Sequence, residues 1–338
     1  MRTPVPALAT TAILLLAIVG GATIGLTTPA LIPDGLIDVT IFALLVLLFL
    51  PISTQSLRRA FRNVRFTASA WLANFVIVAP FGALLAWLLM SGHPAAIAGL
   101  TIYFVAPCTD WFLAFTKLAG GETAGAAALI PLNLATQVAL FPVVVWLVSD
   151  HVSGFAIADL LATMLVWFAL PFGVAALIRA VLSRAGYRGG ADALLSRLPD
   201  AGVPVVLGLL VFQIFAVHAG TITGALTLAP LVLAAVVAFF GFALVVSQVL
   251  GRAAGLSSPE RTALTMTTSA RNAPLMLALT MTTIPDQPLM YSVIVLAMLA
   301  EFPHLTTLAY AFRRKLGSAP APAAPVPRRR SSHAVRYR

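Results

Sequence analysis

Three charged side chains fall at membrane depth in otherwise apolar stretches of this sequence. They are Asp110, Arg271 and Glu301. A charge at the centre of a membrane-spanning helix costs roughly 2.5–3.5 kcal/mol, so such residues usually serve a transported ion, a proton or a partner charge. Arg271 could neutralise either acid and act only as structural glue. Because two acids face one base, the second acid could carry a proton or hold a cation.

Two of these charges lie in polar, proline-bearing interruptions at matching places in the two halves of the chain. Residues 106–110 (Ala-Pro-Cys-Thr-Asp) interrupt the apolar run 95–118, and residues 269–274 (Ser-Ala-Arg-Asn-Ala-Pro) interrupt the run 262–283. Each proline lacks an amide donor and predicts a helix break. Paired broken helices indicate a binding site at the midplane of a secondary transporter. A simple proline kink in each helix is the alternative.

Polar residues around these breaks are the candidate site. For substrate binding we expect Cys108, Thr109, Asn133, Arg271 and Asn272. For ion coupling we expect Glu301, Asp110, Ser269 and Gln137. Asn133 and Gln137 are four residues apart and share one helix face, where they could line the site or join two helices.

Metal and enzyme chemistry have little support in the sequence. Glu301 and His304 have the E-x-x-H spacing of di-metal helix bundles, but a second such pair is missing. Motifs of serine hydrolases, zinc proteases and phosphate-binding loops are also missing. We therefore expect no enzyme, no metal centre and no cofactor.

The composition requires a lipid environment. Of the 338 residues, 60% are hydrophobic and 9% are charged, which is more apolar surface than a soluble protein of this length can bury. A membrane-spanning helix needs about 20 apolar residues, and ten such runs are present. They cover about residues 7–25, 36–52, 67–90, 95–118, 123–148, 157–178, 201–217, 227–250, 262–283 and 289–312. The sequence predicts an all-α membrane protein with ten transmembrane helices.

The basic residues predict the orientation. With the amino terminus in the cytoplasm, all loops that contain Lys or Arg face the cytoplasm and the opposite loops contain none. This distribution follows the positive-inside rule and predicts a multi-pass protein of the cell (inner) membrane with both termini cytoplasmic. The net charge of +10 follows from this topology. The lipid bilayer is the expected partner, and no nucleic acid is needed.

The ten predicted spans divide equally at the loop 150–155. Because five is odd, the second half must have the opposite membrane orientation, as in an inverted repeat. We therefore expect a first five-helix repeat at 1–150, a second, inverted repeat at 151–316 and a tail at 317–338. The tail is basic and rich in Pro and Ala, so we expect it to be disordered in the cytoplasm.

The polar breaks resemble those of a known family, the arsenite permeases of the bile acid/sodium symporter superfamily. Residues 106–109 (Ala-Pro-Cys-Thr) are similar to the signature of their fourth helix. Residues 131–133 (Pro-Leu-Asn) resemble their fifth helix, 271–272 (Arg-Asn) the paired asparagines of their ninth, and 300–303 (Ala-Glu-Phe-Pro) a motif of their tenth. The resemblance extends over all ten spans, and the stretch around Cys108 is its most specific part.

The resemblance implies a fold and an activity. Spans 3–5 and 8–10 would form a core in which the broken fourth and ninth helices cross, and spans 1, 2, 6 and 7 would form a panel. Members of this branch expel arsenite or antimonite, usually against protons, and a thiol such as Cys108 suits soft As(III). Two positions depart from the branch. Pro274 stands where it has a glutamate, and Asp110-Trp111 stand where it has small or apolar residues.

The features together favour a secondary active transporter, an antiporter that exports arsenite or antimonite in exchange for protons and confers arsenical resistance. The alternative is a sodium-coupled symporter or carrier of an organic anion. Cys108 favours the first activity, since an organic anion needs no thiol, and Arg271 favours the second, since neutral arsenite needs no positive charge. The expected partners are a small inorganic or organic solute and a proton or Na⁺. A receptor or scaffold would need a signalling domain or tail motif, and we find neither.

Overall fold

The computed structural model describes residues 7–27, 33, 35–50, 63–109, 111–149, 157–184, 191–219 and 226–317. Secondary structure in these ranges is helical, apart from one isolated β-bridge. Asp110, the loop 150–155 and the tail from Ser318 lie outside the described residues, so the expectations placed on them remain predictions. The all-α class expected from the sequence is confirmed.

The helices follow the apolar runs of the sequence closely. In chain order they are α1 (Ala7–Thr27), α2 (Leu36–Phe49), α4 (Val64–Trp71), the π-helix η1 (Leu72–Val78), α5 (Ala79–Leu89), α6 (Pro94–Val105), α7 (Phe112–Leu118), α8 (Thr123–Ser149), α9 (Ile157–Arg184), α10 (Ala191–Val217), α12 (Ala229–Ala253), α13 (Ser258–Ser269), α14 (Ala273–Thr283) and α15 (Pro288–Gly317). The expected fourth run is divided into α6 and α7, and the ninth into α13 and α14.

The length and surface of the helices fit a membrane protein. Five helical stretches within the described ranges are long and apolar enough to cross a bilayer: Val64–Leu89, Thr123–Val148, Arg197–Val217, Ala229–Ala253 and Pro288–Arg314. Large apolar side chains are exposed along α12, including Leu233, Val237 and Val245. Such a surface suits lipid rather than water. The chain is an all-α, multi-pass membrane protein, and the inverted relation of its halves remains a prediction.

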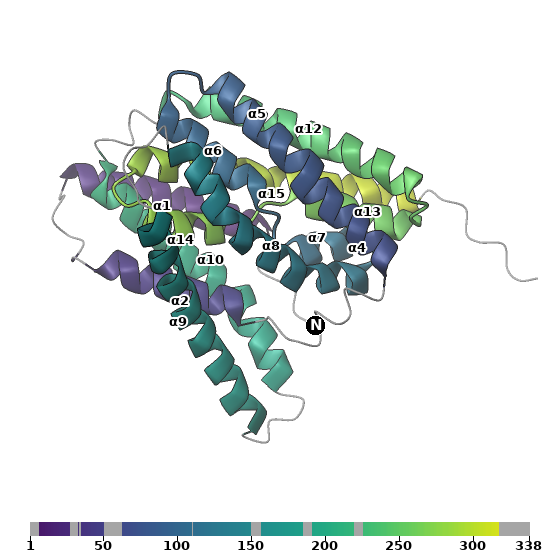
Figure 1. Cartoon of the computed structure of the whole chain (residues 1–338), viewed down its shortest axis with the longest axis horizontal. Coiled ribbons are helices and arrows are strands. Elements are labelled where there is room, and N and C mark those ends of the chain that lie inside the picture. The colour runs from purple at the N-terminus through teal and green to yellow at the C-terminus, as the bar shows by residue number, and fades with distance from the viewer. Residues whose placement is uncertain are drawn as a thin grey trace, which may run out of the picture.

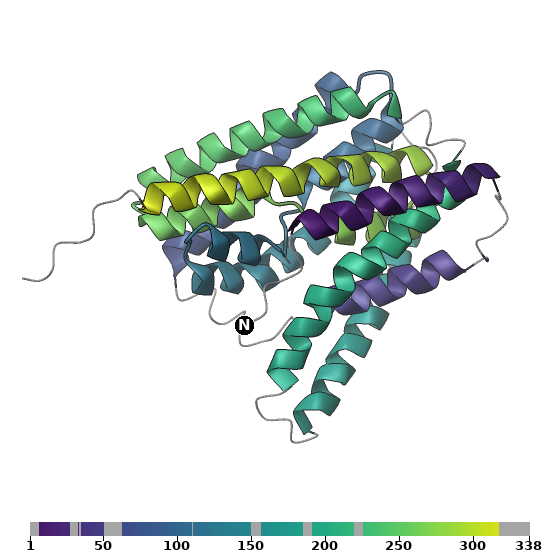
Figure 2. The ribbon, with the colours of Figure 1, turned by 180° about the vertical axis from the view of Figure 1, so that it is seen from behind.

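The helices pack in two groups (Figures 1 and 2). In the first group α10 packs against α1 and α2, and α9 packs against α2. The second group contains α4 to α8 with η1, together with α12, α13 and α15. The half-helix α14 contacts α2 and α9 of the first group as well as α6 and α15 of the second. The second half of the second broken helix, α14, therefore lies between the two groups.

Side-chain caps bring the starts of α4 and α13 together. Ser257 and Glu260 form a capping box, in which the Glu260 carboxylate accepts from the Ser257 amide at 2.8 Å. The other oxygen of Glu260 accepts from Asn63 Nδ2 at 2.8 Å, and Asn63 caps α4 through the amide of Phe66. The hydrogen bonds from Ser257 lower the pKa of the Glu260 carboxyl, with a smaller contribution from Asn63.

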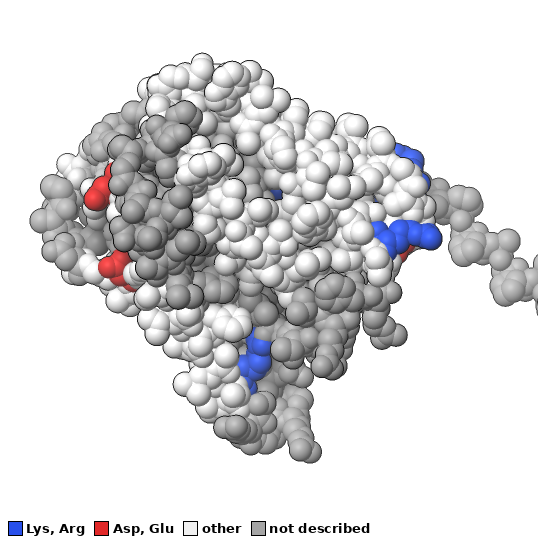
Figure 3. All heavy atoms as spheres, in the orientation of Figure 1, with Lys and Arg blue, Asp and Glu red and all other residues white. Residues whose placement is uncertain are grey.

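Figure 3 shows red acidic atoms at the left of the view and blue basic atoms at the right, with further blue atoms below the centre. Asp38 and Asp286 are exposed near the starts of α2 and α15. Arg65 and Arg252 are exposed at the start of α4 and the end of α12. Exposed charges near the ends of helices suit a membrane protein, because these ends lie outside the hydrocarbon.

Candidate functional site

Each of the two broken helices ends shortly before a proline. Helix α6 ends at Val105, and Ala106 is extended with φ −102° and ψ 107°. This conformation is the one that a residue before proline prefers, so Pro107 explains the first break. Helix α13 ends at Ser269, but Pro274 lies in the first turn of α14, where proline is tolerated. The second break therefore lies at 270–272, shortly before Pro274. The carbonyl four residues before Pro274 is that of Ala270, which accepts from the Cys108 amide instead of a helical donor, as expected for a break at this proline.

The two extended segments pair with each other. Pro107 and Arg271 form an antiparallel β-bridge. The Cys108 amide donates to the Ala270 carbonyl at 3.0 Å, and the Asn272 amide donates to the Ala106 carbonyl at 2.8 Å. Backbone groups freed by a break cost several kcal/mol each if they remain unpaired in hydrocarbon. The backbone groups that one break leaves free are thus hydrogen-bonded by those of the other break. The two broken helices cross at this point.

Arg271 is completely buried at this crossing, with 0% of its surface exposed. Its Nη1 donates to the Phe104 carbonyl at 3.0 Å, and its Nη2 donates to Asn74 Oδ1 at 3.1 Å and to the Thr268 carbonyl. Its Cζ lies 5.1 Å from the centroid of the Phe239 ring, a cation–π distance. The guanidinium is therefore held by neutral oxygen atoms and an aromatic face.

The π-helix η1 presents Asn74 to Arg271. The amide of Ala79 bonds to the carbonyl of Asn74, five residues earlier, directly before Pro80. A proline at position 80 clashes with the carbonyl four residues before it, and the wider π turn relieves this clash. Asn74 is fully buried, and its Nδ2 donates to Thr267 Oγ1 at 3.4 Å. Its amide thus connects α13 to the guanidinium.

Glu301 of α15 contacts the crossing through its carboxylate. Oε1 accepts from the backbone amide of Arg271 at 3.1 Å and from Trp111 Nε1 at 3.3 Å, and Oε2 accepts from the Tyr103 hydroxyl at 3.0 Å. Among the described residues, Glu301 meets Arg271 through the backbone and not through the guanidinium. Asp110, the other acid that Arg271 could neutralise, lies outside the described residues. A pairing of Asp110 with Arg271 therefore remains a prediction.

The remaining candidates surround the crossing. Asn272 Nδ2 donates to Thr109 Oγ1 at 3.0 Å, and Asn133 Nδ2 donates to Thr267 Oγ1 at 3.4 Å. Cys108, the single cysteine of the chain, is buried beside them with 1% of its surface exposed. Buried side-chain oxygens around the crossing have no hydrogen-bond partner among the described residues. They are Asn133 Oδ1, Gln137 Oε1, Ser269 Oγ and Asn272 Oδ1.

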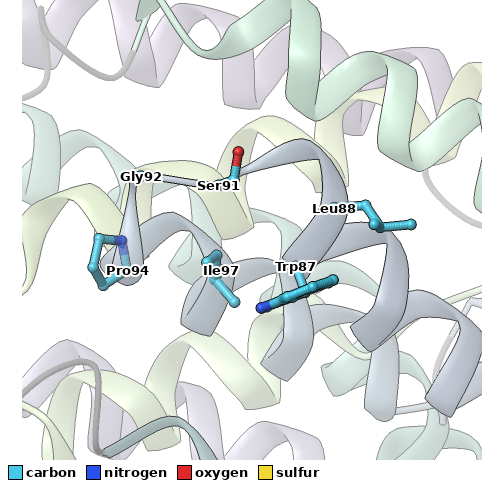
Figure 4. A pocket seen from close by; sticks show the side chains of 6 residues that line it. All are labelled: Trp87, Leu88, Ser91, Gly92, Pro94 and Ile97. Atoms are coloured by element: carbon cyan, nitrogen blue, oxygen red, sulfur yellow. The ribbon is translucent and has the colours of Figure 1, made fainter.

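A hollow on the surface lies away from this crossing (Figure 4). It has a volume of ≈ 390 Å³ and is lined by Trp87, Leu88, Ser91, Gly92, Pro94 and Ile97. These residues form the turn between α5 and α6, at the end of α6 opposite to the break. The 12 residues of α6 rise about 18 Å. Since it also lacks a charged lining residue, this hollow is separate from the candidate site.

Three contact residues were missed at the sequence level. Tyr103 and Trp111 donate to Glu301, and Asn74 accepts from Arg271. Asn74 is an isolated amide within the apolar run 67–90, which is a usable signal because buried amides in membrane helices usually have a partner. Tyr103 and Trp111 flank the first break, but aromatic residues are too common in membrane helices to mark a site.

The comparison with family models supports the superfamily part of the sequence resemblance. A model described as the Sodium Bile acid symporter family matches residues 39–225, more than half of the chain. The matched range includes the first break, Asn133 and Gln137, and it ends before Arg271 and Glu301. No curated protein matches the chain, and the arsenite permease branch remains a prediction. The chain belongs to the sodium bile acid symporter family, whose members are membrane transporters.

Proposed function

We propose that this chain is a Na⁺-coupled secondary transporter that moves a small organic anion. The proposal rests on four buried side-chain oxygens that have no hydrogen-bond partner within the described part of the chain, those of Asn133, Gln137, Ser269 and Asn272. An unpaired buried polar atom in a folded protein calls for an explanation, and an ion or water ligand is the common one. Here several such atoms come from three helices that meet at one crossing.

The type of these atoms favours a hard cation. Amide and hydroxyl oxygens suit hard ions, whereas soft ions prefer sulfur or imidazole ligands. Discontinuous helices in transporters also bind Na⁺ close to their broken segments. Glu301 supplies a negative charge next to the crossing, because its carboxylate accepts from the Arg271 amide. Neutral ligands beside one acid are a suitable environment for a monovalent ion that must bind and leave in each cycle.

Thermal unfolding in detergent tests the coupling ion without a known substrate. We expect NaCl to raise the Tm of the wild-type chain relative to choline chloride, because a ligand that binds only the folded state stabilises it. Gln137→Leu should lose this effect. Gln213→Leu is the matched control, since Gln213 is also buried with both amide atoms unpartnered, but lies in α10. Equal Na⁺ stabilisation of the two variants would contradict the proposed ion site.

Transport assays then test the solute. Proteoliposomes with an inward Na⁺ gradient should accumulate a labelled bile acid, the solute named in the family description. Accumulation should stop when choline replaces Na⁺. Uptake that is independent of Na⁺ would contradict symport, even if the bile acid itself is carried.

A second candidate function is arsenite or antimonite efflux, and the specific observation behind it is Cys108. Its buried position at the crossing puts a soft sulfur ligand beside the candidate site. If arsenite is the solute, Cys108→Ser should lose resistance in an arsenite-sensitive host, since a hydroxyl keeps the size but not the soft ligand. Normal membrane expression of the variant is the control. Full resistance with Cys108→Ser would exclude a thiol-dependent arsenite mechanism.

We also propose that the protein lies in the inner membrane with both termini in the cytoplasm. Exposed Arg65 and Arg252 at one end, and Asp38 and Asp286 at the other, support this orientation. Cysteine substitutions near the two ends, labelled from outside with an impermeant thiol reagent, provide the test. Labelling of a cysteine placed at Asp286 but not at Arg252 is expected.

A further inference from the structure

The carbonyl ends of two half-helices converge on a single cation that belongs to the protein itself. Phe104 lies in the last turn of α6, and Thr267 and Thr268 lie in the last turn of α13. The carbonyls of all three accept hydrogen bonds from the Arg271 guanidinium, and Asn74 Oδ1 completes the group. We call these four oxygen acceptors the carbonyl cage.

The charge of the cage matches that of its occupant. The last carbonyls of a helix have no partner within the helix, and the end of each helix carries about −0.5 elementary charge. The ends of α6 and α13 together thus provide about one negative charge, and one guanidinium neutralises it. Broken transporter helices commonly use such carbonyl ends to coordinate a mobile cation. In this chain Arg271 supplies the cation covalently.

Two simpler roles for Arg271 agree less well with its contacts. As glue for Glu301, the acid at the crossing that the structure describes, its guanidinium would be expected to face the carboxylate, but the contact between them runs through the Arg271 backbone amide. As a counter-charge for an anionic solute, it would be expected to reach an accessible surface, but the side chain is 0% exposed and lies over the Phe239 ring. The partners of the guanidinium are the ones that a coordinated cation would have.

We propose that Arg271 is a tethered cation that permanently fills a cation position between the ends of α6 and α13. This position is distinct from the unpartnered oxygens of the proposed Na⁺ site, and it holds whatever solute the protein carries. Two consequences follow. The filled cage does not bind a mobile coupling ion in the wild-type chain, and removal of the guanidinium creates a binding position for a small monovalent cation.

Chemical rescue with free guanidinium tests this proposal. The full chain carrying Arg271→Ala is purified in detergent, and its Tm is measured in millimolar guanidinium chloride and in choline chloride. Guanidinium should raise the Tm of the variant by about 2–4 °C when its concentration is roughly ten times its Kd. It should not raise the Tm of the wild-type chain, in which the cage is filled. Absence of any rise in the variant would overturn the proposal.

A second comparison covers the case in which Arg271→Ala does not fold. Arg271→Lys keeps a positive charge near the cage, whereas Arg271→Met keeps a long side chain without charge. If the cage requires a cation, the lysine variant should give several-fold more folded protein than the methionine variant. Equal or better yield of Arg271→Met would mean that only the volume of the side chain matters, and would overturn the proposal.

The rescue is also separable from the proposed Na⁺ site. Gln137→Leu removes a ligand of that site but leaves the cage unchanged. Guanidinium should therefore still stabilise the double variant Arg271→Ala/Gln137→Leu. Rescue that persists while wild-type Na⁺ stabilisation is absent would refute the transport proposal alone, and rescue that disappears with Gln137 would refute a separate cage.

Discussion

Substitution of Glu301 separates the role of a charge from the role of a hydrogen-bond acceptor. The carboxylate accepts from three donors, the Arg271 amide, the Trp111 indole and the Tyr103 hydroxyl. In Glu301→Gln the amide oxygen can accept from Arg271 and Trp111, and the Tyr103 hydroxyl can rotate to accept from the new NH₂ group. In Glu301→Ala the Arg271 amide and the Trp111 indole lose their partner, and the Tyr103 hydroxyl keeps only the Ala297 carbonyl at 3.5 Å. We expect the glutamine variant to fold and the alanine variant to be severely destabilised.

The magnitudes follow from the number of bonds. A buried donor left unsatisfied costs about 1–3 kcal/mol, so Glu301→Ala should lose about 2–9 kcal/mol, with the lower values applying if the Ala297 carbonyl satisfies Tyr103. This loss approaches the entire stability of many proteins, about 5–15 kcal/mol. Glu301→Gln exchanges charge-assisted for neutral hydrogen bonds, a loss of about 1 kcal/mol each and about 3 kcal/mol in total. The Arg271 charge adds little to the cost, because neutral carbonyls and Asn74 hold the guanidinium.

Thermal unfolding of the purified variants measures the difference. One kcal/mol corresponds to about 2–4 °C in Tm for a protein of 150–250 residues, and to less for a longer chain. We expect Glu301→Ala to unfold at a lower Tm than Glu301→Gln. Tyr103→Phe is a useful control, since it removes one donor together with its need for a partner. If Glu301→Gln were as unstable as Glu301→Ala, the carboxylate charge itself would be required by Arg271. That result would refute the argument that the carbonyl cage neutralises the arginine.

Further predictions concern the ends and the packing of the helices. Hydrogen bonds from Ser257 lower the pKa of the Glu260 carboxyl in the folded protein. The carboxylate therefore stabilises the fold fully above the pKa of the unfolded chain, and this stabilisation is lost as the pH falls through the lower pKa of the folded state. The Tm difference between wild type and Glu260→Gln should shrink in acid. Asn74→Leu should lower stability by about 1–3 kcal/mol, measured by thermal unfolding, because an Arg271 donor loses its acceptor; an unchanged Tm would contradict this. A Cβ at Gly25 would lie 2.3 Å from a carbonyl of α10, so Gly25→Val should reduce folded yield by size-exclusion chromatography. Gly173→Val, at a position without neighbouring atoms, should not.

The helices were predictable because a bilayer leaves few alternatives. Apolar runs of about 20 residues must be helical in hydrocarbon, where each backbone group needs an internal partner, and the described helices lie over the predicted runs. The first break was predictable from a local rule, since Pro107 restricts the backbone of Ala106 to an extended conformation. The second break was predictable from Pro274, whose ring clashes with the carbonyl of Ala270, the first residue after α13. Pro274 itself lies in the first turn of α14, where proline is tolerated.

The partners of the buried charges could not be predicted, because they depend on the crossing rather than on the residues. Among charged residues alone, Arg271 has two acids as candidates, and an ion pair is the simplest expectation. The structure adds acceptors that carry no formal charge: two helix ends that converge only because both helices break, and an amide presented by the π-helix η1. Backbone carbonyls are present at every residue, so a sequence does not reveal which of them will be unpaired. The arginine and the paired breaks are therefore one feature, because the breaks create the negative ends that the arginine neutralises. It follows that a substitution that makes either broken helix continuous should release Arg271 from its cage. Such a substitution should destabilise the chain as much as removal of the arginine itself.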